Sequence, residues 1–155
     1  PEPGNEQRIW ELIQSFGKLD MCWGGVGITG HIAFNEPPES GESCTDAEFL
    51  ERPTRILRIA RETKTINAYM NAGADLDAIP DYCITVGMKE INFAQKIRML
   101  MPRDWNAAIL RKALHGPITC HVPVSLFQNH PDAKIYALAL AATTPVVPEI
   151  RVYNK

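Results

Sequence analysis

Three features that would assign the protein to common functional classes are missing from its sequence. The four cysteines form no Cys-x-x-Cys pair, which argues against a zinc site or a thioredoxin-like motif and favours reduced thiols. No apolar run approaches the roughly 20 residues that span a bilayer. The net charge of -2 lacks the basic excess of a nucleic-acid binder. We therefore expect a cytoplasmic protein with no metal and with no nucleic-acid or membrane partner.

The length of 155 residues suits one domain. A fold of this size buries roughly 68–70% of the surface that its unfolded chain exposes. Residues 1–5 have the composition of a loop, and the first residue is not methionine. We expect the chain to be part of a longer protein.

Apolar residues recur at helical spacing in some segments and form short compact runs in others. Helices are predicted over residues 6–16, 62–72, 88–94, 104–114 and 123–128. Strands are predicted over residues 19–26, 55–59, 84–86, 97–101 and 134–140. Residues 36–53 show no periodicity and are predicted to form a loop, and Asp104 suits the N-cap of the helix that follows it. Because strands and helices alternate, we expect an α/β fold with an open, mainly parallel sheet flanked by helices in three layers.

Residues 24–37, GGVGITGHIAFNEP, allow two interpretations of the end of the first predicted strand. The spacing Gly25-x-Gly27-x-x-Gly30 is that of a dinucleotide-binding turn, which needs a full helix after the third glycine. Only six residues separate Gly30 from Pro37, and the two consecutive prolines there would break such a helix. The sequence therefore favours a tight turn at the carboxyl end of a strand, where α/β proteins place their sites.

His31 and Glu36 in this turn suit proton-transfer chemistry. Histidine titrates near neutral pH, and a nearby carboxylate can orient the ring and support its charged form. Asn35 can donate a hydrogen bond to a ligand oxygen. The alternative interpretation is a histidine satisfied within the core and a Glu36 on a solvated loop.

The position of the turn also predicts a cleft. We expect His31 at the mouth of a cleft at the carboxyl end of strand 19–26, with Glu36 close to it. Residues 36–53 and the helix over residues 62–72 have few apolar anchors, so we expect them to form a mobile cover over this cleft.

Three blocks of the sequence resemble the glucosamine-6-phosphate deaminase (isomerase) family, in the order in which the family has them. Residues 27–37 are similar to the signature G-x-D/N-G-H-I-A/G-F-N-E-P, whose F-N-E-P ending the related 6-phosphogluconolactonases lack. Residues 84–88, ITVGM, are similar to the strand and turn L-T-V-G-x. Residues 116–131 are similar to G-P-V-T followed by V-P-A-S-x-L-Q-x-H-P.

The resemblance implies an open α/β sheet and a conversion of an amino-sugar 6-phosphate into fructose 6-phosphate and ammonia without a cofactor. His31 would help to open the pyranose ring, supported by Glu36. Thr29 completes the candidate catalytic residues, although it stands where the family has an acidic or amide residue and carries no charge. The candidate substrate-binding residues are Gly27, Gly30, Asn35, Tyr69 and Trp105.

Two of these candidates depart from the family pattern. Tyr69 and Trp105 stand where the resemblance places an arginine and a lysine that bind the sugar phosphate. Neither side chain is charged, so phosphate affinity should fall or the substrate should differ. Arg61, Lys64 and Arg103 lie near enough in the sequence to replace the lost charges.

By this resemblance, residues 1–155 correspond to the carboxyl-terminal part of the family's domain. The family's phosphate loop and the aspartate that abstracts the C2 proton have no counterpart here, so we expect an incomplete portion of the fold. The leading hypothesis is a hexosamine-phosphate isomerase/deaminase that binds a small-molecule sugar phosphate and forms a homo-oligomer. The alternatives are a non-catalytic sugar-phosphate-binding or regulatory homologue, a structural subunit, and a 6-phosphogluconolactonase-like hydrolase.

Overall fold

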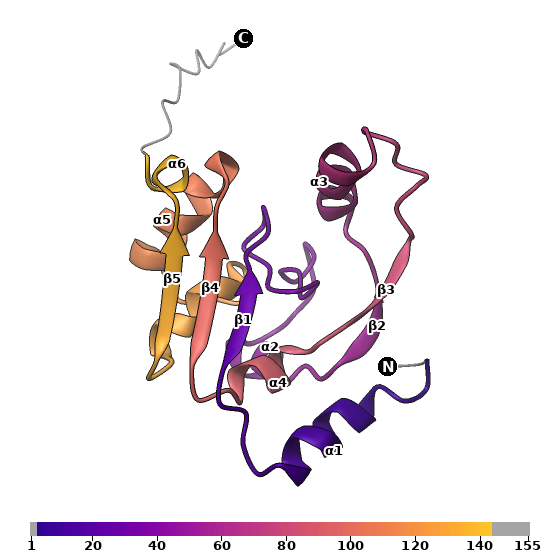
Figure 1. The fold of residues 1–155 in the computed structure, drawn as a ribbon, viewed down its shortest axis with the longest axis vertical. Helices are drawn as coiled ribbons and strands as arrows, with labels where there is room; N and C mark the ends of the chain where they lie inside the picture. Colours follow the sequence, from indigo (N-terminus) through magenta and orange to yellow (C-terminus); the bar gives the residue numbers. More distant parts are fainter. Residues whose placement is uncertain (1–2, 144–155) are drawn as a thin grey trace.

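The computed structural model describes residues 3–143 as strands and helices that alternate along the chain (Figure 1). The strands are β1 Cys22–Gly25, β2 Arg55–Arg58, β3 Tyr82–Thr85, β4 Ile97–Met101 and β5 Ala133–Ala137. The α-helices are α1 Gln7–Ser15, α2 Asp46–Leu50, α3 Arg61–Asn71, α4 Met88–Asn92, α5 Ala107–His115 and α6 Ala139–Ala142. Two 3-10 helices are η1 Asp104–Asn106 and η2 Pro123–Asn129.

Three strands form one parallel sheet in the order β1-β4-β5. Cys22 of β1 pairs with Ile97 of β4, which also pairs with Ala133 of β5. The carboxyl ends of the three strands therefore lie at the same edge of the sheet (Figure 1). This arrangement confirms the predicted α/β fold with an open parallel sheet, and β4 has the predicted bounds.

The predicted strands 55–59 and 84–86 lie outside this sheet. β2 and β3 pair with each other in an antiparallel register, with Arg55 opposite Thr85. The prediction of a buried strand over residues 84–86 is wrong, because only Thr85 among these residues is buried. A separate two-stranded sheet has too few neighbours to bury both faces of a strand.

One face of the parallel sheet packs into the core. Alternate residues of a strand point to the same face, and on β4 the side chains that face the core are Ile97, Met99 and Met101. They belong to one cluster with buried residues of α5 and η2, including Leu110 and Phe127. This packing places the helical layer on that face.

The other face of the sheet is largely uncovered within residues 3–143. Trp23, Leu100 and Tyr136 on this face are 58%, 43% and 48% exposed. Trp23 stacks on Tyr136 with 5.7 Å between the ring centroids. The described part of the chain thus builds an incomplete portion of the predicted three-layer arrangement.

The prediction that residues 36–53 form only a loop is wrong, because they contain the helix α2. Thr45 caps this helix by accepting a hydrogen bond from the N–H of Glu48, whose side chain accepts in turn from the N–H of Thr45. Phe49 on α2 is fully buried in the core. A helix of five residues is too short to show a periodic pattern, but the Thr-x-x-Glu spacing is a local signal for its start.

The prediction that Asp104 is an N-cap is also wrong. Asp104 is the first residue of η1, and α5 begins at Ala107. The N–H of Arg103 donates to the side chain of Asn106 at 3.1 Å, while the carboxylate of Asp104 accepts from the N–H of Trp105. Asn106 stands at the N-cap position of α5 without a side-chain bond to that helix, and its amide oxygen instead holds the N–H of Arg103.

Two predicted strands are longer than the observed ones. β1 occupies residues 22–25 of the predicted 19–26, and β5 ends at Ala137. Residues 138–140 instead lead into α6, because an alanine-rich segment has a high helix propensity.

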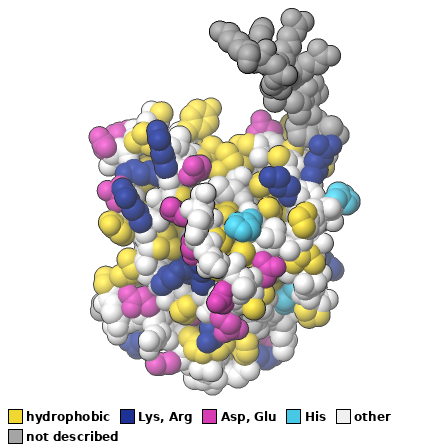
Figure 2. Space-filling model, turned by 180° about the vertical axis from the view of Figure 1, so that it is seen from behind, with side chains coloured by type: hydrophobic (Ala, Val, Ile, Leu, Met, Phe, Trp, Pro, Cys, Tyr) yellow, Lys and Arg dark blue, Asp and Glu magenta, His cyan; other side chains and the backbone are white. Residues whose placement is uncertain are grey.

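Charged side chains of both signs are interspersed with hydrophobic and neutral ones on the face shown in Figure 2. This mixture agrees with a net charge of -2. Within residues 3–143, no helix combines the length and the apolar character needed to cross a membrane. All four cysteines are free thiols.

Candidate active site

The segment after β1 is a tight, hydrogen-bonded turn. The N–H of Gly27 donates to the carbonyl of His31 at 2.9 Å, and the N–H of Gly30 donates to the carbonyl of Gly27 at 3.0 Å. Gly30 has a φ of +89°, a conformation that a residue with a Cβ rarely adopts. No helix follows Gly30, so the dinucleotide-binding interpretation fails and the turn serves to present His31.

Gly27 makes room for the ring of His31. A Cβ on Gly27 would lie only 1.9 Å from Cε1 of His31, so no larger residue fits while the ring holds this position. The first glycine of the signature is therefore needed for the close approach of this ring to the backbone.

Three polar side chains from two parts of the chain meet at Glu36. Its Oε1 lies 3.0 Å from Nδ1 of His31, and its Oε2 accepts a hydrogen bond from the Thr29 hydroxyl at 2.6 Å. The hydroxyl of Thr63, on α3, donates to Oε1 as well. Thr29 Oγ1 also lies 2.9 Å from Nδ1 of His31. The structure thus brings together the three predicted catalytic residues and adds Thr63.

This set of donors controls the charge of Glu36. Burial raises the pKa of the Glu36 carboxyl, but the hydrogen bond and charge of His31, together with two threonine hydroxyls, lower it more. The net pKa of Glu36 lies below its ordinary value. Glu36 is therefore ionised at neutral pH and can hold an imidazolium.

The contact with Glu36 fixes which nitrogen of His31 faces a ligand. A carboxylate only accepts hydrogen bonds, so Nδ1 carries a proton in this contact. Nε2 has no hydrogen-bond partner among residues 3–143, and no buried side-chain nitrogen or oxygen there lacks a partner. Nε2 is therefore accessible and can accept and return a proton.

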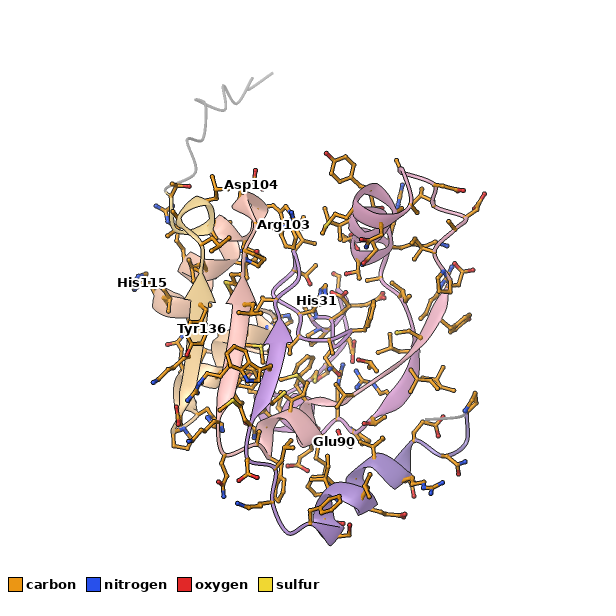
Figure 3. All side chains as sticks on the ribbon, viewed as in Figure 1. His31, Glu90, Arg103, Asp104, His115 and Tyr136 are labelled. Carbon is orange, nitrogen blue, oxygen red and sulfur yellow. The ribbon has the colours of Figure 1, made fainter. Side chains whose placement is uncertain are left out.

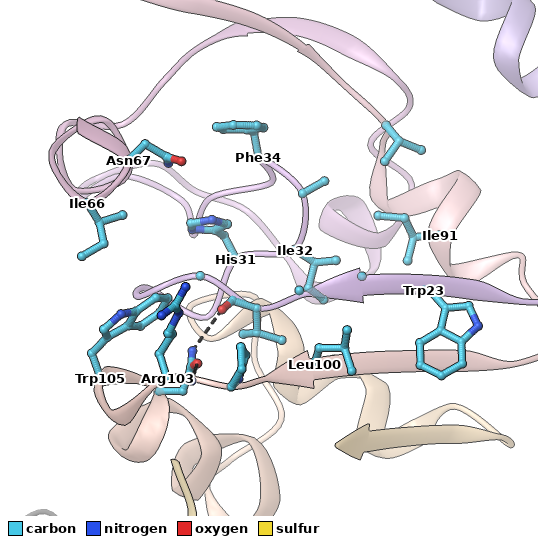
Figure 4. A pocket seen from close by; sticks show the side chains of 18 of the residues that line it. Trp23, His31, Ile32, Phe34, Ile66, Asn67, Ile91, Leu100, Arg103 and Trp105 are labelled. Carbon is cyan, nitrogen blue, oxygen red and sulfur yellow. Dashed lines mark hydrogen bonds between the residues drawn. The ribbon is translucent and has the colours of Figure 1, made fainter. Parts of the chain in front are cut away.

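A cavity of about 540 Å³ lies beside His31 and follows β1 along the exposed face of the sheet. Figure 4 shows Arg103 and Trp105 at one end of this cavity and Trp23 at the other. His31 and Arg103 both lie beyond the carboxyl ends of strands, whereas Glu90 lies at the opposite end of the fold (Figure 3). His31 is only 7% exposed, so it forms part of the cavity wall rather than its mouth.

Asn35 does not fit the predicted ligand contact. Its side chain is fully buried, and its Nδ2 donates to the carbonyls of Ile32 and Val86 at 3.0 and 2.8 Å. Its Oδ1 accepts from Arg55 at 2.8 Å. With both amide protons in use, Asn35 holds the site segment against β2 and the end of β3.

Tyr69 does not reach the cavity either. Its side chain is 73% exposed, and α3 instead lines the cavity with Ile66, Asn67 and Met70. One helical turn of α3 faces the cavity, and Tyr69 points away from it. An alignment by sequence position does not show which side of a helix a residue faces. Trp105, the other substrate-binding candidate that departs from the family pattern, does line the cavity.

The predicted cover is confirmed only in its position at α3. α3 lines the cavity, but α2 buries Phe49 in the core and Asp46 accepts the N–H of Cys120 at 2.6 Å. These contacts anchor residues 46–50 in the fold, because the segment has apolar and polar partners that its composition did not suggest. The prediction that residues 36–53 form a mobile cover is therefore wrong for α2.

Sequence reasoning missed Thr63 and Asn106. Asn106 is fully buried, and its Nδ2 donates to the carbonyl of Val26 at 3.0 Å, 80 positions away in the sequence. Thr63 is 27 positions from Glu36. Neither lies in a motif, and only the meeting of distant segments gives them a place at the site. Within residues 3–143, no group of three or more His, Cys, Asp or Glu side chains could hold a metal ion.

Comparison with known proteins supports the resemblance. No protein-family model matches the chain. A curated glucosamine-6-phosphate deaminase from Lachnoclostridium phytofermentans is 34% identical over 124 residues, which are 80% of this chain and 48% of that protein. The solved structure of a monomeric glucosamine-6-phosphate deaminase superimposes with a TM-score of 0.77 at 28% identity, over 90% of this chain and 53% of that one.

The 6-phosphogluconolactonase from Leishmania guyanensis shares the fold alone. It superimposes with a TM-score of 0.52 at 18% identity, over 83% of this chain and 42% of that one. The chain spans about half the length of the curated relatives it matches. By sequence and by fold, the chain is related to the glucosamine-6-phosphate deaminase family.

Proposed function

We propose that the protein is a hexosamine-phosphate isomerase/deaminase and that this chain supplies the residues that open the sugar ring. The observation that carries the proposal is the 3.0 Å contact between Nδ1 of His31 and Oε1 of Glu36, which lies directly behind the ring that His31 contributes to the cavity wall. The named relatives are glucosamine-6-phosphate deaminases, which supports an amino-sugar 6-phosphate as substrate. The products would be the ketose 6-phosphate and ammonia.

Ring opening needs one proton to move and one bond to break. Nε2 of His31 accepts the proton of the C1 hydroxyl, and the resulting imidazolium is held by the Glu36 carboxylate. The C1–O5 bond breaks as the C1 carbonyl forms, and Nε2 returns the proton to O5. No cofactor takes part in this step, because the proton leaves and re-enters the same substrate.

The later proton transfer at C2 needs a further base. The chain spans about half the length of its relatives, and we infer that it corresponds to the carboxyl-terminal part of their domain. We assign to this chain ring opening and substrate binding only. A homo-oligomeric, cytoplasmic protein remains the expectation for the whole molecule.

A second candidate function is sugar-phosphate binding without turnover. It is favoured by Thr29, which stands beside Nδ1 of His31 and gives the imidazole no second carboxylate. It is also favoured by Tyr69, which leaves the cavity without a cation at that position. A hydrolase related to the 6-phosphogluconolactonases has no such specific observation in its favour.

The test is ammonia release from glucosamine 6-phosphate by the protein, with detection of fructose 6-phosphate. Replacing His31 by Gln should lower the rate by about 10²–10⁴-fold with the closed-ring sugar, and far less with an open-chain analogue that cannot form a pyranose ring. His115→Gln is the matched control, because His115 lies at the end of α5 away from the cavity (Figure 3).

Each result assigns a role. Equal losses on the closed and open substrates would contradict a role of His31 in ring opening. Binding of glucosamine 6-phosphate without ammonia release would instead support the non-catalytic alternative, and thermal stabilisation by the ligand would detect it.

A further inference from the structure

Among residues 3–143, one Lys or Arg side chain lies in the wall of the cavity beside His31. Of the three cations that could replace the charges missing at Tyr69 and Trp105, only Arg103 lines this cavity. Arg61 and Lys64 line a different cavity of about 500 Å³. Lys64 is also paired with Asp81, with 2.6 Å between Nζ and Oδ1.

Arg103 is placed at the cavity by a buried clamp. Oδ1 of Asn106 accepts the N–H of Arg103 at 3.1 Å, and Nδ2 of Asn106 donates to the carbonyl of Val26 at 3.0 Å. Val26 directly follows β1 and precedes Gly27, against which His31 packs. Asn106 therefore links the turn that carries Arg103 to the turn that carries His31, and it holds the two at the same edge of the sheet.

The guanidinium of Arg103 is available to a ligand. Among residues 3–143, no carboxylate lies within ion-pair distance of it, whereas Arg52 and Arg98 are paired with Glu42 and Asp132. The adjacent carboxylate of Asp104 accepts the backbone N–H of Trp105 instead. An exposed guanidinium at the end of a mainly apolar cavity presents parallel N–H donors that match the oxygens of a phosphate.

We propose that Arg103 binds the phosphate group of the substrate and that Asn106 is the residue that positions it. The inference rests on the proposed function, since it takes a sugar phosphate as the ligand. It places the sugar ring between Arg103 and His31. The phosphate contact then comes from Arg103 and not from position 69 or 105.

The test compares the binding of glucosamine 6-phosphate with that of glucosamine by calorimetric titration of the protein. Arg103→Ala should weaken the binding of glucosamine 6-phosphate by about tenfold to 100-fold, the usual effect of losing a charged hydrogen bond. Binding of glucosamine should be unchanged. The affinity of Arg103→Lys for glucosamine 6-phosphate should lie between those of the wild type and Arg103→Ala, because lysine keeps the charge and loses the bidentate geometry.

Arg111→Ala is the matched control, because Arg111 is an exposed arginine of α5 that does not line the cavity. It should leave both affinities unchanged. If Arg103→Ala binds the phosphorylated sugar as tightly as the wild type, the inference is overturned. An equal loss with both sugars would overturn it too, because the effect would not depend on the phosphate.

The positioning role of Asn106 is tested by a measurement that a purely structural role would not affect. In a double-mutant cycle, Asn106→Ala should weaken the binding of glucosamine 6-phosphate and leave the binding of glucosamine unchanged. In the Arg103→Ala background, Asn106→Ala should cause little further loss of affinity. If Asn106→Ala does not fold, Asn106→Asp keeps the acceptor for the N–H of Arg103 and replaces it in the cycle. Additive losses would overturn the positioning role.

The inference and the proposed function fail in different ways. Ammonia release that is insensitive to Arg103→Ala at low substrate concentration would overturn the inference and leave the function standing. Binding of glucosamine 6-phosphate that depends on Arg103, without ammonia release, would overturn the function and leave the inference standing. No binding of glucosamine 6-phosphate at all would overturn both.

Discussion

The hydroxyl of Thr63 donates a hydrogen bond to Oε1 of Glu36 and so joins helix α3 to the segment that carries His31. The same carboxylate contacts Nδ1 of His31 at 3.0 Å and accepts from Thr29 at 2.6 Å. Glu36 is thus held by three donors, two from its own segment and one from α3. A carboxylate in this position keeps its charge and its orientation, and both are needed to support an imidazolium.

Thr63→Val should uncouple α3 from the site. The substitution keeps the shape of the side chain and removes one donor to a charged acceptor, so we expect a loss of about 1.5–3 kcal/mol in the free energy of unfolding. Ammonia release should also slow, because Glu36 loses part of its orientation. Urea unfolding and steady-state rates measure the two effects.

Thr65→Val is the control on the same helix, because within residues 3–143 the exposed hydroxyl of Thr65 bonds only to the carbonyl of Arg61 in its own helix. We expect its effect on stability to stay within about 0.5 kcal/mol. Equal effects of the two substitutions would show that Thr63 acts through helix propensity and not through Glu36.

Glu36→Gln should change how stability depends on pH. Because the pKa of Glu36 is lowered in the folded protein, its carboxylate contributes stability above the ordinary glutamate pKa of about 4.3. That contribution is lost as the pH falls through the lower pKa of the folded state. The difference in unfolding free energy between wild type and variant should therefore be largest near pH 7 and shrink toward pH 3.

Glu62→Gln serves as the control, because Glu62 is exposed on α3 and forms no ion pair within residues 3–143. The difference in unfolding free energy between Glu62→Gln and the wild type should vary less between pH 7 and pH 3. A pH-independent difference for Glu36→Gln would refute the stabilising role of the ionised carboxylate.

Gly27→Ala should displace the ring of His31. The added Cβ would lie 1.9 Å from Cε1 of the ring, so the imidazole must move and lose its contact with Glu36. We expect ammonia release to fall by about 10²-fold or more. In the control Gly25→Ala, the added Cβ meets no atom within 4 Å, and the His31 resonances in an NMR spectrum should stay in place. Unshifted His31 resonances in Gly27→Ala would contradict the packing described here.

Phe49→Ala should show that α2 belongs to the core. Phe49 is fully buried, and removing a buried aromatic ring costs about 3–5 kcal/mol. Phe16, which is 72% exposed, offers the control, since Phe16→Ala should cost no more than about 0.5 kcal/mol. Similar small losses of unfolding free energy for both variants would instead support the hypothesis that residues 36–53 form a mobile cover.

Local patterns in the sequence were enough to predict several elements. β4 has the predicted bounds, and α1 falls within the predicted 6–16 because its apolar residues recur at helical spacing. The glycines also indicated the tight turn, because a positive φ at Gly30 and a close approach at Gly27 are properties of single residues. The pairing of His31 with Glu36 follows from the same short segment, which brings the two side chains within reach of each other.

The tertiary structure decided which other side chains join that pair. Thr63 reaches Glu36 across 27 positions and Asn106 reaches Val26 across 80, and neither contact has a local signal. Packing also turned Tyr69 outward and Phe49 inward, against the expectations for both segments. A short pattern fixes φ, ψ and the period of an element, whereas the direction in which the element faces depends on what it packs against, and that is a property of the whole chain.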